Sequence, residues 1–224
     1  MQNLPRKLYD TPVIGFSNMT DDAVCALEQN FGAHHYDRLN VVVRTAQGSW
    51  ITDIDGRKYL DCLAAYSAAN LGHHHPKVVN ALMRALVGNY ASVISNVVYT
   101  DPLALFLSKT AEFVPQLGPR FGMNGNKVMP KNGGVESVET AIKMARYYGW
   151  KEKNIPDGKQ EIIVFNNNFH GRMTTVISFS TQQKYRAGFG PLTPGFVSVE
   201  FGNLDAVKAA INKNTCGILV EPLQ

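Results

Sequence analysis

The 224-residue sequence has few cysteines, no long apolar segment and no concentration of charge of one sign. Its three cysteines, at positions 25, 62 and 216, are far apart and form no CxxC pair, which predicts a reducing compartment. No apolar run approaches the roughly 18 residues of a membrane-spanning helix, so we expect no membrane association. The net charge of +4 is scattered without a basic run, which argues against nucleic acid as a partner.

The N-terminus also lacks the hydrophobic core of a secretory signal. Together with the cysteine pattern, this predicts a cytoplasmic protein. The mitochondrial matrix stays open as an alternative, because Arg6 and Lys7 precede the first acidic residue.

The overall composition is that of a folded protein, with 45% hydrophobic and 18% charged residues. Thr20 and the two aspartates after it predict a helix from there to about residue 30. Short apolar segments between residues 41 and 60 surround an Asp55-Gly56 turn and predict a small antiparallel meander. Apolar residues at helical spacing after Pro76 predict a helix there, and a second helix is expected from about 101 to 114.

Beyond residue 127 the pattern alternates between strands and helices. We expect strands near Val128 and at 162–165, 175–179, 197–201 and 217–220, with helices at 135–149 and 204–213. Such alternation is typical of an α/β fold with a mostly parallel sheet and helices on both faces. We divide the chain into an N-terminal segment with the meander, residues 1–75, and an incomplete large domain, residues 76–224.

The most informative motif lies at residues 132–146, NGGVESVETAIKMAR. Two glycines directly before an amphipathic helix let backbone N–H groups approach an anion, which the positive helix end favours. A phosphate is therefore one interpretation of this motif. A simple tight turn between strand and helix is the other, and the glycines alone favour it.

A second motif, FNNNFHGR at residues 165–172, follows an apolar strand, where ligands of open α/β sheets bind. An aromatic ring, an imidazole and a guanidinium within four residues suit a flat anionic ligand. A polar loop with one anchoring phenylalanine is an equally good interpretation of these residues.

A third motif contains three consecutive histidines, at residues 73–75, in the segment YSAANLGHHHP. Adjacent side chains do not converge as metal ligands must, and no cysteine or acid follows at ligand spacing. We therefore predict a loop leading into a helix and no metal site.

Together these motifs resemble class III aminotransferases that depend on pyridoxal 5′-phosphate (PLP). Residues 132–146 resemble the signature of that family. Residues 72–76 resemble its G-H-x-H-P motif, and residues 169–172 resemble its F-[HW]-G-R motif. The resemblance runs from about residue 31 to the end. Within the class, residues 66–70 and 189–196 look most like ornithine aminotransferases. The resemblance implies the fold of aspartate aminotransferase (PLP-dependent fold type I), with part of the small domain and the first part of the large one.

The resemblance also implies roles for individual residues. Gly134 and Val135 would bind the PLP phosphate through their backbone N–H groups, and Phe169 would stack on the pyridine ring with His170 beside it. The substrate pocket would contain Tyr36, Tyr66 and Arg172, with Arg172 holding a carboxylate.

Two features depart from the family pattern. Gly133 stands where the family has Ser or Thr, and Arg38 and Asn40 replace prolines common after Tyr36. No catalytic residue is assigned, because the Schiff-base lysine and the aspartate that pairs with the pyridinium nitrogen are expected beyond Gln224. We therefore expect this chain to be inactive alone.

The parent function implied is ornithine δ-transamination, in which ornithine and 2-oxoglutarate become glutamate-5-semialdehyde and glutamate, in a homodimer. Acetylornithine, 4-aminobutyrate and lysine ε-transamination are the enzymatic alternatives. A non-catalytic fragment or pseudoenzyme that acts by interaction is the alternative of another class.

Overall fold

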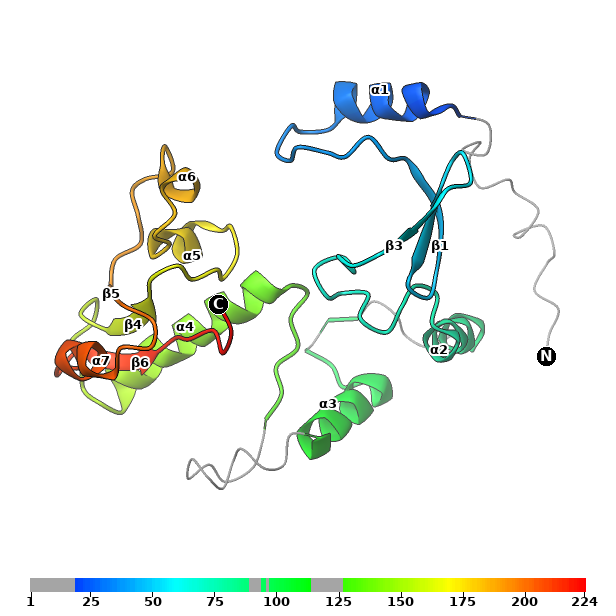
Figure 1. Cartoon of the computed structure of the whole chain (residues 1–224). Helices are drawn as coiled ribbons and strands as arrows, with labels where there is room; N and C mark the ends of the chain where they lie inside the picture. The colour runs from blue at the N-terminus through cyan, green and yellow to red at the C-terminus, as the bar shows by residue number, and fades with distance from the viewer. Residues whose placement is uncertain (1–18, 89–93, 96, 114–126) are drawn as a thin grey trace. The chain divides into compact units, whose positions relative to one another are not determined.

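The computed structural model describes residues 19–88, 94–95, 97–113 and 127–224 and divides the chain into two compact units, 1–100 and 101–224. The domain boundary expected between residues 75 and 76 stays a prediction. In chain order the elements are α1 (Asp21–Phe31), β1 (Val43–Gln47), β2 (Trp50–Asp53), β3 (Lys58–Leu60), α2 (Pro76–Val87), α3 (Asp101–Phe113), α4 (Gly134–Lys151), β4 (Glu161–Phe165), α5 (Thr174–Ser178), α6 (Gln183–Arg186), β5 (Phe196–Val199), α7 (Leu204–Ala210) and β6 (Thr215–Ile218) (Figure 1).

The first unit contains the expected antiparallel meander, in the order β1-β2-β3. Gln47 pairs with Trp50 across a two-residue turn in which Gly48 has φ +57°. The Asp55-Gly56 turn connects β2 to β3, and Gly56 has φ +86°, a conformation that costs glycine little. The hairpin predicted from these two residues is confirmed.

The two helices of this unit begin where the sequence predicts. Thr20 is the N-cap of α1, and its hydroxyl oxygen accepts a hydrogen bond from the backbone N–H of Ala23 at 3.3 Å. Pro76 lies in the first turn of α2, where its missing N–H leaves no helical bond unmade.

The second unit contains a parallel sheet in the order β5-β4-β6, so the strand that comes first in the sequence is the central one. Each neighbour reaches its place through a helix-containing connection, as parallel pairing requires. The central strand β4 is buried along most of its length, and Ile163 and Val164 are fully inaccessible to solvent. The predicted parallel α/β architecture is confirmed.

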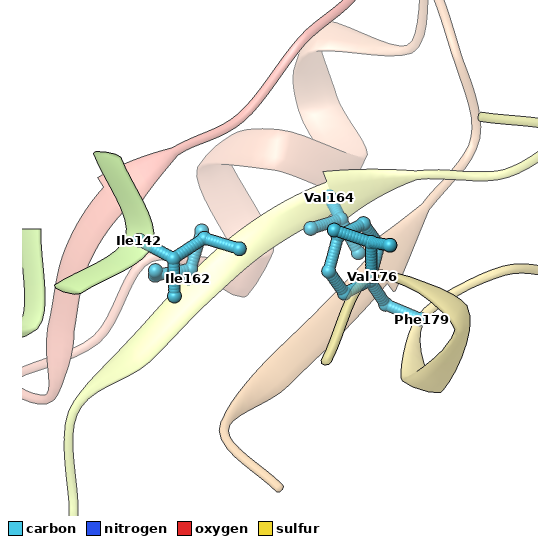
Figure 2. Packing of buried hydrophobic residues seen from close by; sticks show 5 residues of the cluster. All are labelled: Ile142, Ile162, Val164, Val176 and Phe179. Atoms are coloured by element: carbon cyan, nitrogen blue, oxygen red, sulfur yellow. The ribbon is translucent and has the colours of Figure 1, made fainter. Parts of the chain in front are cut away.

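Helices cover both faces of this sheet. On one face Ile162 and Val164 of β4 pack against Ile142 of α4, and against Val176 and Phe179 in and after α5 (Figure 2). On the other face a second buried cluster, with α7 packed against it, consists of Ile163, Phe165 and Val199, with Val197, Ala206, Val207 and Ala210 around them. Full burial of each such aliphatic side chain contributes about 1.5–3 kcal/mol.

Two predicted strands are wrong. Residues 175–179 were expected as a strand because Thr175, Val176 and Ile177 are β-branched, yet Thr174–Ser178 form α5. The Ser178 hydroxyl donates to the carbonyl of Thr174 at 2.6 Å, and burial of the helix against α4 and the sheet decides its conformation. Val128 lies in irregular chain before α4 and not in a strand.

Among the described residues, no helix combines the length and the apolar character needed to cross a membrane.

Candidate functional site

The N-terminus of α4 is capped by a side chain within the helix. Gly133 is the N-cap, in extended backbone conformation, and it has no side chain with which to cap. Glu136 supplies the cap, because one of its carboxylate oxygens accepts hydrogen bonds from the N–H of Asn132 at 2.8 Å and of Gly133 at 3.2 Å. The first backbone bond inside the helix runs from Ser137 to the carbonyl of Gly133.

The N–H groups of Gly134 and Val135 therefore lie at the helix end with no carbonyl one turn before them. The aligned peptide dipoles place partial positive charge at this end. Nothing lies within 4 Å of the position that a Cβ would take at Gly133 or Gly134, so the space beside these backbone atoms is open. Free N–H groups, positive potential and open space fit a phosphate group.

The loop after β4 is held by Asn168, which is buried. Its amide donates to the carbonyl of Phe165 at 2.6 Å and to that of Phe179 at 3.1 Å. The next side chain, Phe169, is 52% exposed. A rigid backbone thus presents an aromatic ring at the carboxyl end of the central strand.

Gly171 brings this loop into contact with the start of α4. A Cβ at Gly171 would lie 2.6 Å from Cγ2 of Val135 and 2.8 Å from its Cβ, and the φ of Gly171 is +121°. Only glycine satisfies both conditions. The two motifs found separately in the sequence are therefore one structural unit, with the aromatic loop packed against the N-terminal end of α4.

Glu221 fixes the same loop from the neighbouring strand. Its carboxylate accepts a hydrogen bond from the backbone N–H of Phe169 at 2.9 Å. Since β4 and β6 are parallel, their carboxyl ends lie at one edge of the sheet, and Glu221 follows β6 as Phe169 follows β4.

His170 is half-buried beside this contact. Its ring lies 5.7 Å from that of Phe179, and its Nε2 atom is buried without a hydrogen-bond partner among the described residues. Burial lowers the pKa of His170 from its ordinary 6.5, and the Glu221 carboxylate opposes part of this change. The imidazole is therefore more readily neutral than an exposed one.

Arg172 lies against two aromatic rings. Its guanidinium carbon is 4.4 Å from the ring centre of Tyr185 and 5.9 Å from that of Phe169. It also lines an open pocket of about 450 Å³ together with Glu139, Met173, Thr174, Thr175, Ile177 and Phe189. A planar cation at the rim of a pocket can bind a carboxylate through two hydrogen bonds.

Tyr66 belongs to the other unit and is 73% exposed. Its segment is closed by Asp61, whose carboxylate accepts hydrogen bonds from the N–H groups of Leu63 at 3.1 Å and Ala64 at 2.9 Å, and from Nε2 of His73 at 2.7 Å. The His73 bond is the main reason that the pKa of Asp61 lies below its ordinary 3.8.

The backbone that carries Tyr66 has an unusual conformation. Four consecutive residues, Ala64, Ala65, Tyr66 and Ser67, have positive φ values between 47° and 75°. None is a glycine, so each carries a steric cost of about 1–2 kcal/mol. Such strain persists where surrounding contacts impose it, as the bonds to Asp61 do here.

Two of the three adjacent histidines have separate side-chain partners, and Nδ1 of His75 is buried without one among the described residues. His73 binds Asp61. The Nδ1 atom of His74 lies 2.9 Å from the carbonyl oxygen of Ala46. His75 precedes α2 as its N-cap. No group of three or more potential metal ligands occurs in the described part of the chain.

Tyr36 also lies in the first unit, where it lines a hollow of about 750 Å³ beside α1. Its ring is 4.9 Å from that of His35. Arg38, which stands in place of a family proline, forms an ion pair with Glu28 of α1. The segment after Tyr36 is thus tied to α1 by a charged contact.

Of the seven predicted binding residues, Gly134, Val135, Phe169, His170 and Arg172 lie in the second unit, and Tyr36 and Tyr66 lie in the first. Sequence reasoning missed Glu221 and Tyr185. The rule that ligands bind at the carboxyl ends of parallel strands could have found Glu221, which follows β6. Nothing in the sequence around Tyr185 marks it.

The model of the aminotransferase class III family matches residues 31–224. The chain belongs to the class III aminotransferases. The family is PLP-dependent, and the open helix end, the exposed Phe169 ring and the neighbouring Arg172 are compatible with that cofactor.

Several curated class III aminotransferases are similar to the chain. Ornithine aminotransferase 2 of Staphylococcus aureus (strain MRSA252) is 41% identical over 203 residues, which are 91% of this chain and 48% of that protein. The ornithine aminotransferase of Staphylococcus carnosus is 44% identical over 88% of this chain and 47% of its own length. The chain thus spans about half the length of the curated relatives it matches.

Solved structures agree in fold. The ornithine aminotransferase of Toxoplasma gondii, whose active site holds PLP at partial occupancy, matches 100% of this chain and 50% of its own, with a TM-score of 0.84 and 28% identity. The acetylornithine aminotransferase of Elizabethkingia anophelis matches 91% of this chain and 47% of its own, with a TM-score of 0.72 and 36% identity.

Proposed function

We propose that this chain supplies the phosphate-binding, ring-stacking and carboxylate-binding residues of an ornithine δ-aminotransferase. The reaction would transfer the δ-amino group of ornithine to 2-oxoglutarate, giving glutamate-5-semialdehyde and glutamate. The contact between Gly171 and Val135 carries this proposal, because it brings the N-terminal end of α4 next to the loop of Phe169 and Arg172. The similarity to several ornithine aminotransferases supports the choice of reaction.

PLP supplies the electron sink that amino-group transfer needs. In this chain Gly134 and Val135 would hold its phosphate by backbone N–H groups, without the hydroxyl that Gly133 lacks. Phe169 would lie against the pyridine ring, on a backbone held by Glu221. The half-buried and readily neutral His170 would stand beside the ring without adding a positive charge.

Arg172 would hold a carboxylate of the amino-acid or 2-oxo-acid substrate, since this side chain lines an open pocket. Tyr36 and Tyr66 would orient ornithine so that the δ-amine, and not the α-amine, reaches the cofactor. We further propose a homodimer as the working state and the cytoplasm as its location.

Acetylornithine transamination is the second candidate, favoured by the 36% identity to the Elizabethkingia enzyme. The 4-aminobutyrate and lysine ε-aminotransferases, and a pseudoenzyme that acts by interaction, remain further alternatives. Acetylornithine, 4-aminobutyrate and lysine differ from ornithine in the groups that flank the reacting amine. Comparing the rates with these substrates therefore separates the candidate reactions.

The test measures kcat/KM for ornithine, N-acetylornithine, 4-aminobutyrate and lysine with the gene product that carries this sequence. We expect ornithine to have the highest value. Arg172→Ala should lower kcat/KM about 10-fold to 100-fold, because a hydrogen-bonded charge contributes roughly 1.5–3 kcal/mol. Arg84→Ala, in the last turn of α2, is the matched control and should leave kcat/KM unchanged. A preference for N-acetylornithine would favour the second candidate, and no turnover of any amine would favour the pseudoenzyme.

A further inference from the structure

One aromatic ring contacts two residues of the proposed site. The ring of Tyr185 lies 6.3 Å from that of Phe169, edge to face at 68°, and the guanidinium carbon of Arg172 lies 4.4 Å from its centre. Arg172 is nearer to Tyr185 than to Phe169, from which it is 5.9 Å away. Tyr185 therefore connects the residue proposed to stack on the cofactor with the residue proposed to hold the substrate.

Tyr185 is placed by two hydrogen bonds, one just before α6 and one from the last residue of the helix. Before the helix, the hydroxyl oxygen of Thr181 accepts a hydrogen bond from the backbone N–H of Asn167 at 2.9 Å, which ties this segment to the loop of Phe169. Within the helix, Arg186 donates to the carbonyl of Ser180 at 3.3 Å. The ring of Tyr185 consequently stands on backbone that is fixed relative to Phe169.

Arg172 is the more exposed residue of this pair. Its side chain is exposed, whereas Tyr185 is half-buried. A long exposed side chain loses rotamer freedom when it binds a ligand, and this loss weakens binding. Attraction between a cation and the face of an aromatic ring holds the guanidinium near the ring before the ligand arrives.

We propose that Tyr185 is a positioning residue that sets the guanidinium of Arg172 beside the Phe169 ring, ready for a substrate carboxylate. The inference rests on the proposed function, because it takes the carboxylate as the ligand of Arg172. It adds a determinant of carboxylate affinity that acts through Arg172 and touches neither substrate nor cofactor.

The first measurement records the side-chain Nε–Hε signal of Arg172 in the NMR spectrum of the 224-residue chain, identified by its loss in Arg172→Lys. The ring current of Tyr185 should move this signal upfield. Tyr185→Leu should abolish the shift and Tyr185→Phe should keep it, since phenylalanine retains the ring. The backbone amide spectrum away from α6 should stay unchanged in both variants, which reports that the fold is intact.

The second measurement titrates the chain with glutarate, a dicarboxylate without a reactive carbonyl. We expect Tyr185→Leu to weaken glutarate binding about twofold to fivefold, the range that a cation–π contact of this exposure supports. Tyr185→Phe should bind as the unchanged chain does. Tyr147→Leu, an exposed tyrosine on α4, is the matched control and should have no effect.

Glutarate affinity in Tyr185→Leu equal to that of the unchanged chain would overturn the positioning role, as would an Arg172 signal that does not respond to removal of the ring. Failure of the unchanged chain to bind glutarate is a different result. It would contradict the carboxylate role of Arg172 in the proposed function, and the positioning role would fall with it.

Discussion

The Nε2 atom of His73 lies 2.7 Å from the Oδ2 atom of Asp61. This contact closes a segment of the first unit that contains Tyr66, and two backbone N–H groups bind the other oxygen of the same carboxylate. A single aspartate thus holds both ends of the segment.

Replacing Asp61 with asparagine should lower the melting temperature of the first unit. The pKa of Asp61 is depressed in the folded state, so its contribution is complete above the ordinary value of 3.8 and is lost as pH falls through the folded value. Asp61→Asn should therefore flatten the acid limb of the stability curve below pH 3.8. Trp50 fluorescence in a Trp150→Phe background reports this unit, with the exposed Asp205→Asn as control. An acid limb as steep as that of the unchanged chain would contradict this role.

Gly171→Ala should destabilise the second unit by roughly 2 kcal/mol or more. The new Cβ would meet Val135 at 2.6 Å, and the φ of +121° is one that side chains avoid. Gly158→Ala is the matched control, because Gly158 has φ +74° with nothing within 4 Å of its Cβ position, and it should cost about 1 kcal/mol. Denaturant unfolding followed by Trp150 in a Trp50→Phe background measures both. Equal losses in the two variants would show that the contact with Val135 is unimportant.

Gly133→Ser should increase affinity for PLP and for inorganic phosphate. The extended backbone of Gly133 accepts any residue, and a Cβ there meets nothing within 4 Å. The hydroxyl would add a hydrogen bond worth about 1 kcal/mol, or roughly fivefold in affinity. Equilibrium dialysis compares it with Gly133→Ala, which adds the Cβ alone. If the alanine variant gains as much as the serine variant, the hydroxyl is not the cause.

His170→Phe should remove a pH dependence near neutrality. The pKa of His170 is lowered by burial, so between the folded value and the ordinary 6.5 the unfolded chain binds more protons. Stability therefore falls as pH drops from 6.5 to the folded pKa and then levels off. Phenylalanine keeps the ring against Phe179 and should give a flat curve in this window. Urea unfolding between pH 7.5 and 4.5 measures this pH dependence of stability. An unchanged slope in the variant would show that a group other than His170 causes it.

Much of the fold follows from local sequence. The Asp55-Gly56 turn, the proline that opens α2 and the apolar segment of β4 each predict their element correctly. The error at α5 arose because the β-branched residues there have a strand preference that tertiary burial overrides. The central place of β4 could not be predicted, since strand order depends on which connections cross the sheet.

The candidate site shows the same division. Gly134 and Phe169 could be predicted as candidates because their motifs are contiguous in the sequence. Glu221 lies 52 residues from Phe169 in the sequence. Tyr185 is brought next to Arg172 by the course of the chain through α5 and α6. Contacts of this kind depend on the folded path, which no local pattern encodes.

The four residues with positive φ around Tyr66 have a consequence for how this segment opens. Each would relax to a right-handed conformation if released, and the contacts to Asp61 and the bridge between Gly48 and His73 prevent it. We expect the segment to have no stable half-open state, because losing one restraint would free strain that opposes the others. Its amides at Ala68, Ala69 and Gly72 should therefore exchange with deuterium together, at one common rate, as a single local unfolding event.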